Sequence, residues 1–387
     1  MELKVSEEII EEDGYIPDED NRIPINIITG FLGSGKTTLL NHWVNSPEFK
    51  DTLVLINEFG DVGLDHELVQ AVDDTVVLLG SGCICCSLQG ELIDSLAQNL
   101  AKSQAGIIPP FRRVIIETTG LADPAGVINT INGDEYLLDN YRYDGTVTVL
   151  DAAFVREQLK KQYEAVKQIA LADLLLISKT DLVDQEEIDA IMEVAQQINP
   201  SVKIYPMVKG NISPKLLFEI GPYKAFNEKY DKKVTSWISI NNKPNIASSL
   251  RPAQLSGGVG VAKPRIIAHT NIDSFALEYE NPLKISTILF AVNKIAENYG
   301  DSVLRMKAIL NIVGRDKPLV IQGVQGAIYP LSELDAWPKN DDKKSKIVFI
   351  VRETVLEQIK MLFNDCMTHP ETEADYYKRM VENIDNA

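Results

Sequence analysis

The chain has 387 residues, of which 45% are hydrophobic and 24% are charged, a composition typical of globular proteins at a length that favours two domains. Lysine and arginine number 38 against 56 aspartate and glutamate residues, so the formal net charge is −18. Because this charge repels phosphate backbones and anionic lipid, we expect no nucleic-acid partner and no membrane partner.

Residues 1–22 form an acidic segment with few apolar side chains, which predicts a disordered leader that orders only when a partner binds it. A purely solubilising tail is the alternative. The leader has no basic-then-apolar signal, and no later apolar run reaches the roughly 18 residues of a membrane-spanning helix. We therefore expect a cytoplasmic protein.

From residue 23 to residue 220, short β-branched runs alternate with amphipathic stretches. Continuous apolar strands with helices between them predict an α/β fold, with a mostly parallel sheet covered by helices on both faces. The predicted strands lie at Ile25–Ile28, Leu53–Ile56, Val76–Leu79, Val114–Ile116, Thr146–Leu150 and Leu174–Ile177.

Residues 30–37 read Gly-Phe-Leu-Gly-Ser-Gly-Lys-Thr and match the P-loop pattern G-x-x-x-x-G-K-[ST] at every defined position. A predicted strand precedes the motif and a helical pattern follows it, which makes a chance glycine-rich turn the weaker interpretation. Backbone N–H groups of such a loop bind phosphates, Lys36 adds charge near the β- and γ-phosphates, and the Thr37 hydroxyl binds Mg²⁺. The predicted phosphate-binding residues are Gly30, Gly33, Ser34, Gly35, Lys36, Thr37 and Thr38.

Three of the four cysteines, Cys83, Cys85 and Cys86, fall within four residues directly after a predicted strand. In an extended segment Cys83 and Cys85 point to the same side, and a turn brings Cys86 to join them. Three thiolates suit Zn²⁺ or Cu(I) and leave a fourth position open, which fits a metal that is released again. Glu58 and His66 are candidates for that position. Buried apolar cysteines and a redox thiol are the alternatives, although the spacing is not C-x-x-C.

Residues 57–65, Asn-Glu-Phe-Gly-Asp-Val-Gly-Leu-Asp, lie between the P-loop helix and the cysteine strand. Their glycines and carboxylates are typical of a mobile switch. A segment that γ-phosphate and Mg²⁺ order could press on the neighbouring metal site.

Glu117 opens the run Glu-Thr-Thr-Gly after the strand Val114–Ile116, at the strand end where ligands bind in open α/β sheets. Its carboxylate can orient Mg²⁺ or the attacking water, and Gly120 can approach a γ-phosphate. A simple helix cap is the alternative for Glu117.

Residues 178–181, Ser-Lys-Thr-Asp, follow the strand Leu174–Ile177. The Asp181 carboxylate can accept the two donors of guanine that adenine lacks, and the Lys179 stem can cover the base. Guanine-reading tetrapeptides usually begin with Asn or Thr, so Ser178 is expected to weaken one supporting contact. An ordinary strand-to-helix turn is the alternative.

Residues 221–262 are predicted to be a linker, residues 263–370 a smaller α+β domain and residues 371–387 a tail. Cys366 and His369 have C-x-x-H spacing, but two ligands do not make a metal site, and a buried cysteine at a helix end is the simpler interpretation. Predicted strands lie at Arg265–Thr270, Phe275–Tyr279, Leu304–Leu310, Leu319–Gln325 and Ile347–Val351, and helices at Leu283–Asn298 and Thr354–Phe363.

The combined motifs resemble those of the CobW-type metallochaperone P-loop GTPases. The matching segments are 30–38, 57–65, 82–86, 117–124 and 178–181, together with Arg305-Met306-Lys307-Ala308 and Gln322-Gly323-Val324, which resemble the family signatures R-x-K-G and Q-G-V. The resemblance implies a GTPase with Zn²⁺, Mg²⁺ and GTP as ligands, and nucleotide-controlled delivery of zinc to a client metalloenzyme. Lys36, Thr37 and Glu117 would then be its catalytic residues.

Within that family the chain most resembles the eukaryotic zinc-regulated GTPase metalloprotein activators, whose client is type 1 methionine aminopeptidase. That branch has a docking motif like C-P-x-L-V-P ahead of the P-loop. Here Tyr15, Ile16 and Pro17 keep only its apolar-apolar-Pro ending. The resemblance implies that the client docks on this segment.

Two other functions are compatible with the motifs. The chain could be a zinc buffer or sensor whose nucleotide site is regulatory, or an ATP-using small-molecule kinase with a structural metal. Activation of an apo-client by GTP but not GDP excludes the first, and selective binding of guanine nucleotides excludes the second.

Overall fold

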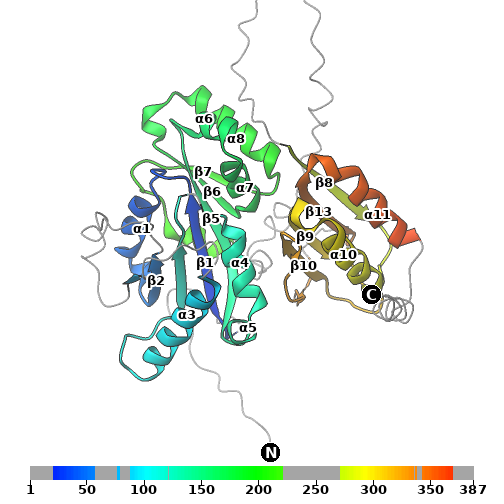
Figure 1. Ribbon diagram of the computed structural model, residues 1–387, viewed down its shortest axis with the longest axis horizontal. Coiled ribbons are helices and arrows are strands. Elements are labelled where there is room, and N and C mark those ends of the chain that lie inside the picture. Colours follow the sequence, from blue (N-terminus) through cyan, green and yellow to red (C-terminus); the bar gives the residue numbers. More distant parts are fainter. Residues whose placement is uncertain are drawn as a thin grey trace, which may run out of the picture.

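The computed structural model of the protein describes residues 21–56, 76–78, 88–120, 122–220, 271–334, 336–337 and 342–368. Two domains lie side by side, the first coloured blue to green and the second yellow to red (Figure 1). The first domain consists, in chain order, of β1 (Ile23–Gly30), α1 (Lys36–Val44), η1 (Pro47–Phe49), β2 (Thr52–Ile56), β3 (Val76–Leu78), α3 (Leu88–Gln104), β4 (Arg113–Glu117), α4 (Pro124–Gly133), α5 (Glu135–Asn140), β5 (Tyr141–Asp151), α6 (Val155–Lys161), α7 (Tyr163–Leu171), β6 (Leu174–Ser178), η2 (Thr180–Leu182), α8 (Gln185–Ile198), β7 (Lys203–Pro206) and η3 (Pro214–Glu219).

The seven described strands of this domain form one parallel sheet in the order β3-β2-β4-β1-β5-β6-β7. Because every strand runs the same way, all their carboxyl ends lie at one edge of the sheet. The predicted α/β fold is confirmed, and each predicted strand of this domain is present.

Alternate residues of the strands pack against helices on opposite faces of the sheet. Ile28 and Val54 pack with Trp43 of α1, whereas Leu55 packs with helices α3 and α4. At β5 and β6, the face of the sheet opposite α1 is covered by α6, α7 and α8. The predicted covering of both faces is therefore confirmed.

The second domain consists of β8 (Ile272–Tyr279), α10 (Ile285–Tyr299), η6 (Gly300–Ser302), β9 (Val303–Leu310), β10 (Leu319–Val324), β11 (Ala327–Ile328), β12 (Ser332–Glu333), β13 (Ser345–Arg352), η7 (Glu353–Val355) and α11 (Leu356–Thr368). Its antiparallel sheet has the order β11-β10-β9-β13-β8, with β12 paired to β10. Helices α10 and α11 pack on the outer face of this sheet, and the inner face meets the first domain (Figure 1). The predicted strand 265–270 and linker 221–262 lie outside the described residues.

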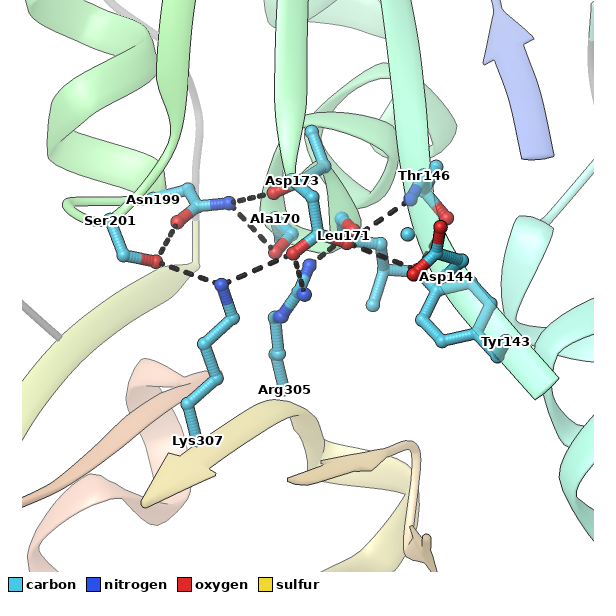
Figure 2. A network of polar contacts seen from close by, with 12 residues as sticks. Tyr143, Asp144, Thr146, Ala170, Leu171, Asp173, Asn199, Ser201, Arg305 and Lys307 are labelled. Carbon is cyan, nitrogen blue, oxygen red and sulfur yellow. Dashed lines mark hydrogen bonds and ion pairs between the residues drawn. The ribbon is translucent and has the colours of Figure 1, made fainter. Parts of the chain in front are cut away.

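A buried ionic cluster joins the two domains (Figure 2). Arg305 and Lys307 are two residues apart on β9 and therefore face the same side. Both pair with Asp173 at the start of β6; the Lys307 Nζ atom lies 3.2 Å from its Oδ1 atom. The Asp173 Oδ2 atom accepts hydrogen bonds of 3.1 Å from the Tyr143 hydroxyl and from the Thr146 backbone N–H.

Burial and the neighbouring charges together set the pKa values of this cluster. Burial lowers the pKa of Lys307 to about 7, with the Arg305 charge acting in the same direction. Burial alone would raise the pKa of Asp173, but the Arg305 and Lys307 charges outweigh it and the net shift is downward. This ionic part of the domain interface therefore depends on charges that are shielded from water.

Across the described residues, no helix combines the length and the apolar character needed to cross a bilayer.

Candidate nucleotide-binding site

The P-loop connects β1 to α1 and is shaped by left-handed backbone. Gly33 and Gly35 have φ of +73° and +96°, and Gly35 directly precedes the first residue of α1. A residue with a Cβ atom adopts such angles only with strain, which explains glycine at these positions. The Lys36 ammonium group turns back over the loop and donates to the backbone oxygens of Gly30 at 2.9 Å and Phe31 at 3.3 Å.

Two candidate magnesium ligands meet at this edge of the sheet. Glu117 is the last residue of β4 and pairs in register with Ile28 of β1, just before the P-loop. The Thr37 hydroxyl donates to the Glu117 Oε1 atom at 3.1 Å, and Glu117 is only 5% exposed. Hard divalent cations prefer a hydroxyl and a carboxylate of this kind, so the residues present fit Mg²⁺.

The segment that follows Glu117 lies directly against the P-loop. A Cβ atom on Gly120 would lie 2.4 Å from the backbone nitrogen of Leu32, so only glycine permits this approach. The buried Gln168 amide on α7 donates to the backbone oxygens of Gly120 at 3.3 Å and Ala122 at 3.4 Å. The segment is therefore fixed from the helix beneath it.

The tetrapeptide at residues 178–181 is also tied to the P-loop. The Lys179 Nζ atom donates to the Gly33 oxygen at 2.8 Å, and the Ser178 hydroxyl donates to the Ser34 oxygen at 2.6 Å. Ser178 thus keeps a direct contact with the loop, and the expectation that this contact is weaker than that of the usual Asn or Thr stays a prediction. Asp181 is exposed in η2, where its carboxylate can meet a base.

Two further parts of this site were not predicted. Asp151, the buried last residue of β5, pairs with Lys179 at 2.6 Å. The turn after β7 approaches the site from the other side: the Thr180 hydroxyl donates to the Met207 oxygen at 3.3 Å, and Gly210 packs on the Thr38 backbone. The place of Asp151 at the carboxyl end of a predicted parallel strand is the signal that would have identified it, whereas the turn after β7 gave no such signal because β7 was not predicted.

The predicted metal and docking residues lie outside the described residues. These are Cys83, Cys85, Cys86, Glu58, His66 and the segment Tyr15, Ile16 and Pro17; His369, for which no metal site was predicted, also lies outside them. Within the part of the chain that the structure describes, no group of three or more His, Cys, Asp or Glu side chains is arranged to hold a metal ion. Cys366 is buried in α11 and packs in the core of the second domain.

Comparison with known proteins supplies the family. Residues 24–206 match the CobW/HypB/UreG nucleotide-binding domain, and residues 272–367 match the cobalamin synthesis protein CobW C-terminal domain. The zinc chaperone YjiA of Escherichia coli is 32% identical over 348 residues, which cover 89% of this chain and 98% of YjiA. The chain belongs to the CobW/HypB/UreG family.

Other members of the CobW/HypB/UreG family agree with this assignment. Zinc-regulated GTPase metalloprotein activator 1 of Schizosaccharomyces pombe is 31% identical over 234 residues, covering 59% of this chain and 55% of that protein. The crystal structure of the Zn(II)-bound YjiA GTPase from E. coli superposes with a TM-score of 0.65 and 27% identity, covering 89% of this chain and 99% of YjiA. The resemblance stated from the motifs is confirmed, and so is the two-domain fold class.

Proposed function

We propose that this protein is a zinc chaperone that couples GTP binding and hydrolysis to the transfer of zinc to a client metalloenzyme. The observation that carries the proposal is the contact between the Thr37 hydroxyl and the Glu117 carboxylate, 3.1 Å apart beside the P-loop. β3, which precedes the three cysteines, ends at the same edge, two strands from β4 and so about 10 Å away. The zinc chaperone and GTPase names of the relatives support both halves of the proposal.

The residues at this edge divide the chemistry of hydrolysis between them. The P-loop N–H groups and Lys36 bind the phosphates and stabilise the charge that develops during transfer. Thr37 and Glu117 would hold Mg²⁺, which neutralises phosphate charge when it is bound. Asp181, carried on a turn anchored to the P-loop, would select guanine.

Zinc is the cargo in this scheme. Cys83, Cys85 and Cys86 would supply three thiolates, and Glu58 is a candidate for the fourth position. A site with one replaceable ligand lets a client's side chains enter before the thiolates leave. The thiols must stay reduced for this role, which is why we assign the activity to the cytoplasm. For the client we propose a type 1 methionine aminopeptidase that docks on Tyr15, Ile16 and Pro17.

Zinc affinity in each nucleotide state tests the proposal. A chelator competition on the full chain without nucleotide, with GDP and with a non-hydrolysable GTP analogue should give affinities that differ at least tenfold between states. Lys36→Ala should abolish hydrolysis while stoichiometric zinc binding persists. As the matched control, Cys85→Ser should lose zinc and keep hydrolysis. Equal zinc affinity in all three forms, with apo-client activity restored equally by GTP, GDP or free zinc, would refute the coupling.

A further inference from the structure

The second domain touches the nucleotide-binding edge of the first at Asp123. This residue ends the segment that runs from Glu117 past Gly120, and it caps α4. Its Oδ1 atom accepts a hydrogen bond of 3.0 Å from the Ala125 backbone N–H. Its Oδ2 atom accepts hydrogen bonds from Lys167 of α7 at 2.7 Å and from the Gln325 side chain of the second domain at 3.1 Å.

Gln325 occupies an unusual position for its residue type. It and Gly326 form the two-residue turn between β10 and β11, with φ of +46° and +77°. Two positive φ angles in a two-residue hairpin indicate a type I′ turn, in which Asn-Gly is strongly preferred. Glutamine is less suited to this backbone than asparagine, and a strained position of this kind is a reason to look for a function of the side chain.

The hairpin that carries Gln325 is rigidly seated. The Cα atoms of Gly326 and Gly300 are packed so closely that a Cβ atom on Gly326 would lie 2.9 Å from the Gly300 Cα atom. Val324, at the end of β10, is buried in the same apolar cluster as Ala125 and Ile128 of α4. The turn is therefore held between its own domain and α4, and its position relative to Asp123 is defined.

The first domain links Asp123 to the reacting end of the nucleotide. Only two residues separate Asp123 from Gly120, which lies against the P-loop backbone at Leu32. Gln168, next to Lys167 on α7, holds the Gly120 and Ala122 oxygens. A shift of Asp123 would therefore change how Gly120 and Glu117 face a γ-phosphate, whereas the contacts to the base lie on other strands.

We propose that Gln325 is a positioning residue for GTP hydrolysis: from the second domain it fixes Asp123, and through Asp123 it fixes the segment between Glu117 and α4. The inference rests on the GTPase function proposed above. It explains the side chain at the turn, because asparagine would suit the backbone better but is one methylene too short to make the same contact. The second domain is thereby a working part of the hydrolytic site.

Three variants of the full chain test the role of Gln325. Gln325→Asn relieves the turn and removes the contact, so kcat for GTP hydrolysis should fall about fivefold, while KM, GDP affinity and melting temperature stay within error of the unmodified chain or improve. Gln325→Glu places a second carboxylate against Asp123 and should lower kcat at least as much. Gln358→Asn, the same change on the exposed face of α11, is the matched control and should change nothing.

An exchange of the two groups separates positioning from packing. In the double variant Gln325→Glu with Asp123→Asn, the asparagine oxygen still caps α4, its amide can donate to the new carboxylate, and that carboxylate replaces Asp123 as the acceptor for Lys167, so kcat should recover to within about twofold of the unmodified chain. The inference is overturned if the single variants leave kcat unchanged, if the exchange recovers nothing, or if kcat falls only together with melting temperature. In each of these cases the unmodified chain still hydrolyses GTP, so the proposed function stands. Absence of hydrolysis in the unmodified chain would defeat both.

Discussion

Replacement of Asp173 by alanine should show how much the domains depend on the buried ionic cluster. Asp173 is 8% exposed, and its partners Arg305 and Lys307 are 3% and 2% exposed. Without the carboxylate, the buried Arg305 guanidinium loses the anion with which it pairs, and Lys307, whose pKa is already lowered to about 7, loses the charge that favours its protonated form. Breaking a buried ion pair by removing one partner costs about 3–5 kcal/mol, and this is the loss of unfolding free energy that we expect.

Urea unfolding followed by circular dichroism measures this loss. Because the cluster lies between domains, its removal should also split a single transition into two, with the second domain separating first. The double variant Asp173→Asn with Lys307→Met serves as the control, since it removes one charge of each sign and keeps the volumes similar. It should recover most of the loss. If Asp173→Ala lowers the unfolding free energy by less than about 1 kcal/mol, Asp173 does not compensate the buried cations as the reasoning requires.

Three further predictions concern single positions. The pKa of Lys307 is lowered from 10.5 to about 7, so between these pH values the folded protein has lost a proton that the unfolded chain keeps. Relative to Lys307→Met, the unfolding free energy of the unmodified protein should therefore rise with pH through this window, by at most about 1.4 kcal/mol per pH unit. A difference in unfolding free energy that stays constant with pH in urea titrations would contradict the burial argument. Gly120→Ala should lower GTP affinity at least tenfold, because the new Cβ atom displaces Leu32 of the P-loop. The control Gly126→Ala, in open space on α4, should instead raise the melting temperature. Equal GTP affinity of the Gly120→Ala variant and the unmodified chain would show that the P-loop adapts. Ser178→Ala should weaken binding of a fluorescent guanine nucleotide about fivefold, because it removes the donor to the Ser34 oxygen. Unchanged binding would show that the contact of Ser178 with the P-loop is weak, as expected from the sequence.

The sheet and the phosphate site could be predicted because their signals are local. Four of the six predicted strands of the first domain are continuous apolar runs, which is what burial on both faces requires, and the other two, Ile25–Ile28 and Thr146–Leu150, are interrupted only by Asn26 and by Thr146 and Thr148. β7 was missed because Lys203–Pro206 is a four-residue edge strand whose side chains are partly or fully exposed, so it lacks a buried apolar run. β5 begins at Tyr141, earlier than its apolar run, because the polar Arg142 and Asp144 of this stretch are also buried.

The domain interface could not be predicted because its partners are far apart in the chain. Gln325 and Asp123 are separated by 202 residues, and Arg305 and Asp173 by 132. Neither pair produces a periodic pattern in the sequence from which the contact could be predicted. The R-x-K and Q-G-V signatures mark the right strands, but a motif does not show which surface its side chains meet. The contact of Ser178 with the P-loop could not be predicted for a related reason: whether a hydroxyl reaches the loop depends on a strand separation that the sequence does not show.

Strand β6 connects the ionic cluster at the domain interface to the turn beside the P-loop. Asp173 immediately precedes this strand and Ser178 is its last residue, so the two are about 17 Å apart along one extended segment. An extended strand held between two neighbours transmits displacement along its axis with little loss. A displacement of the second domain that moves Asp173 would therefore also move Ser178 and the adjoining turn, which contact the P-loop backbone.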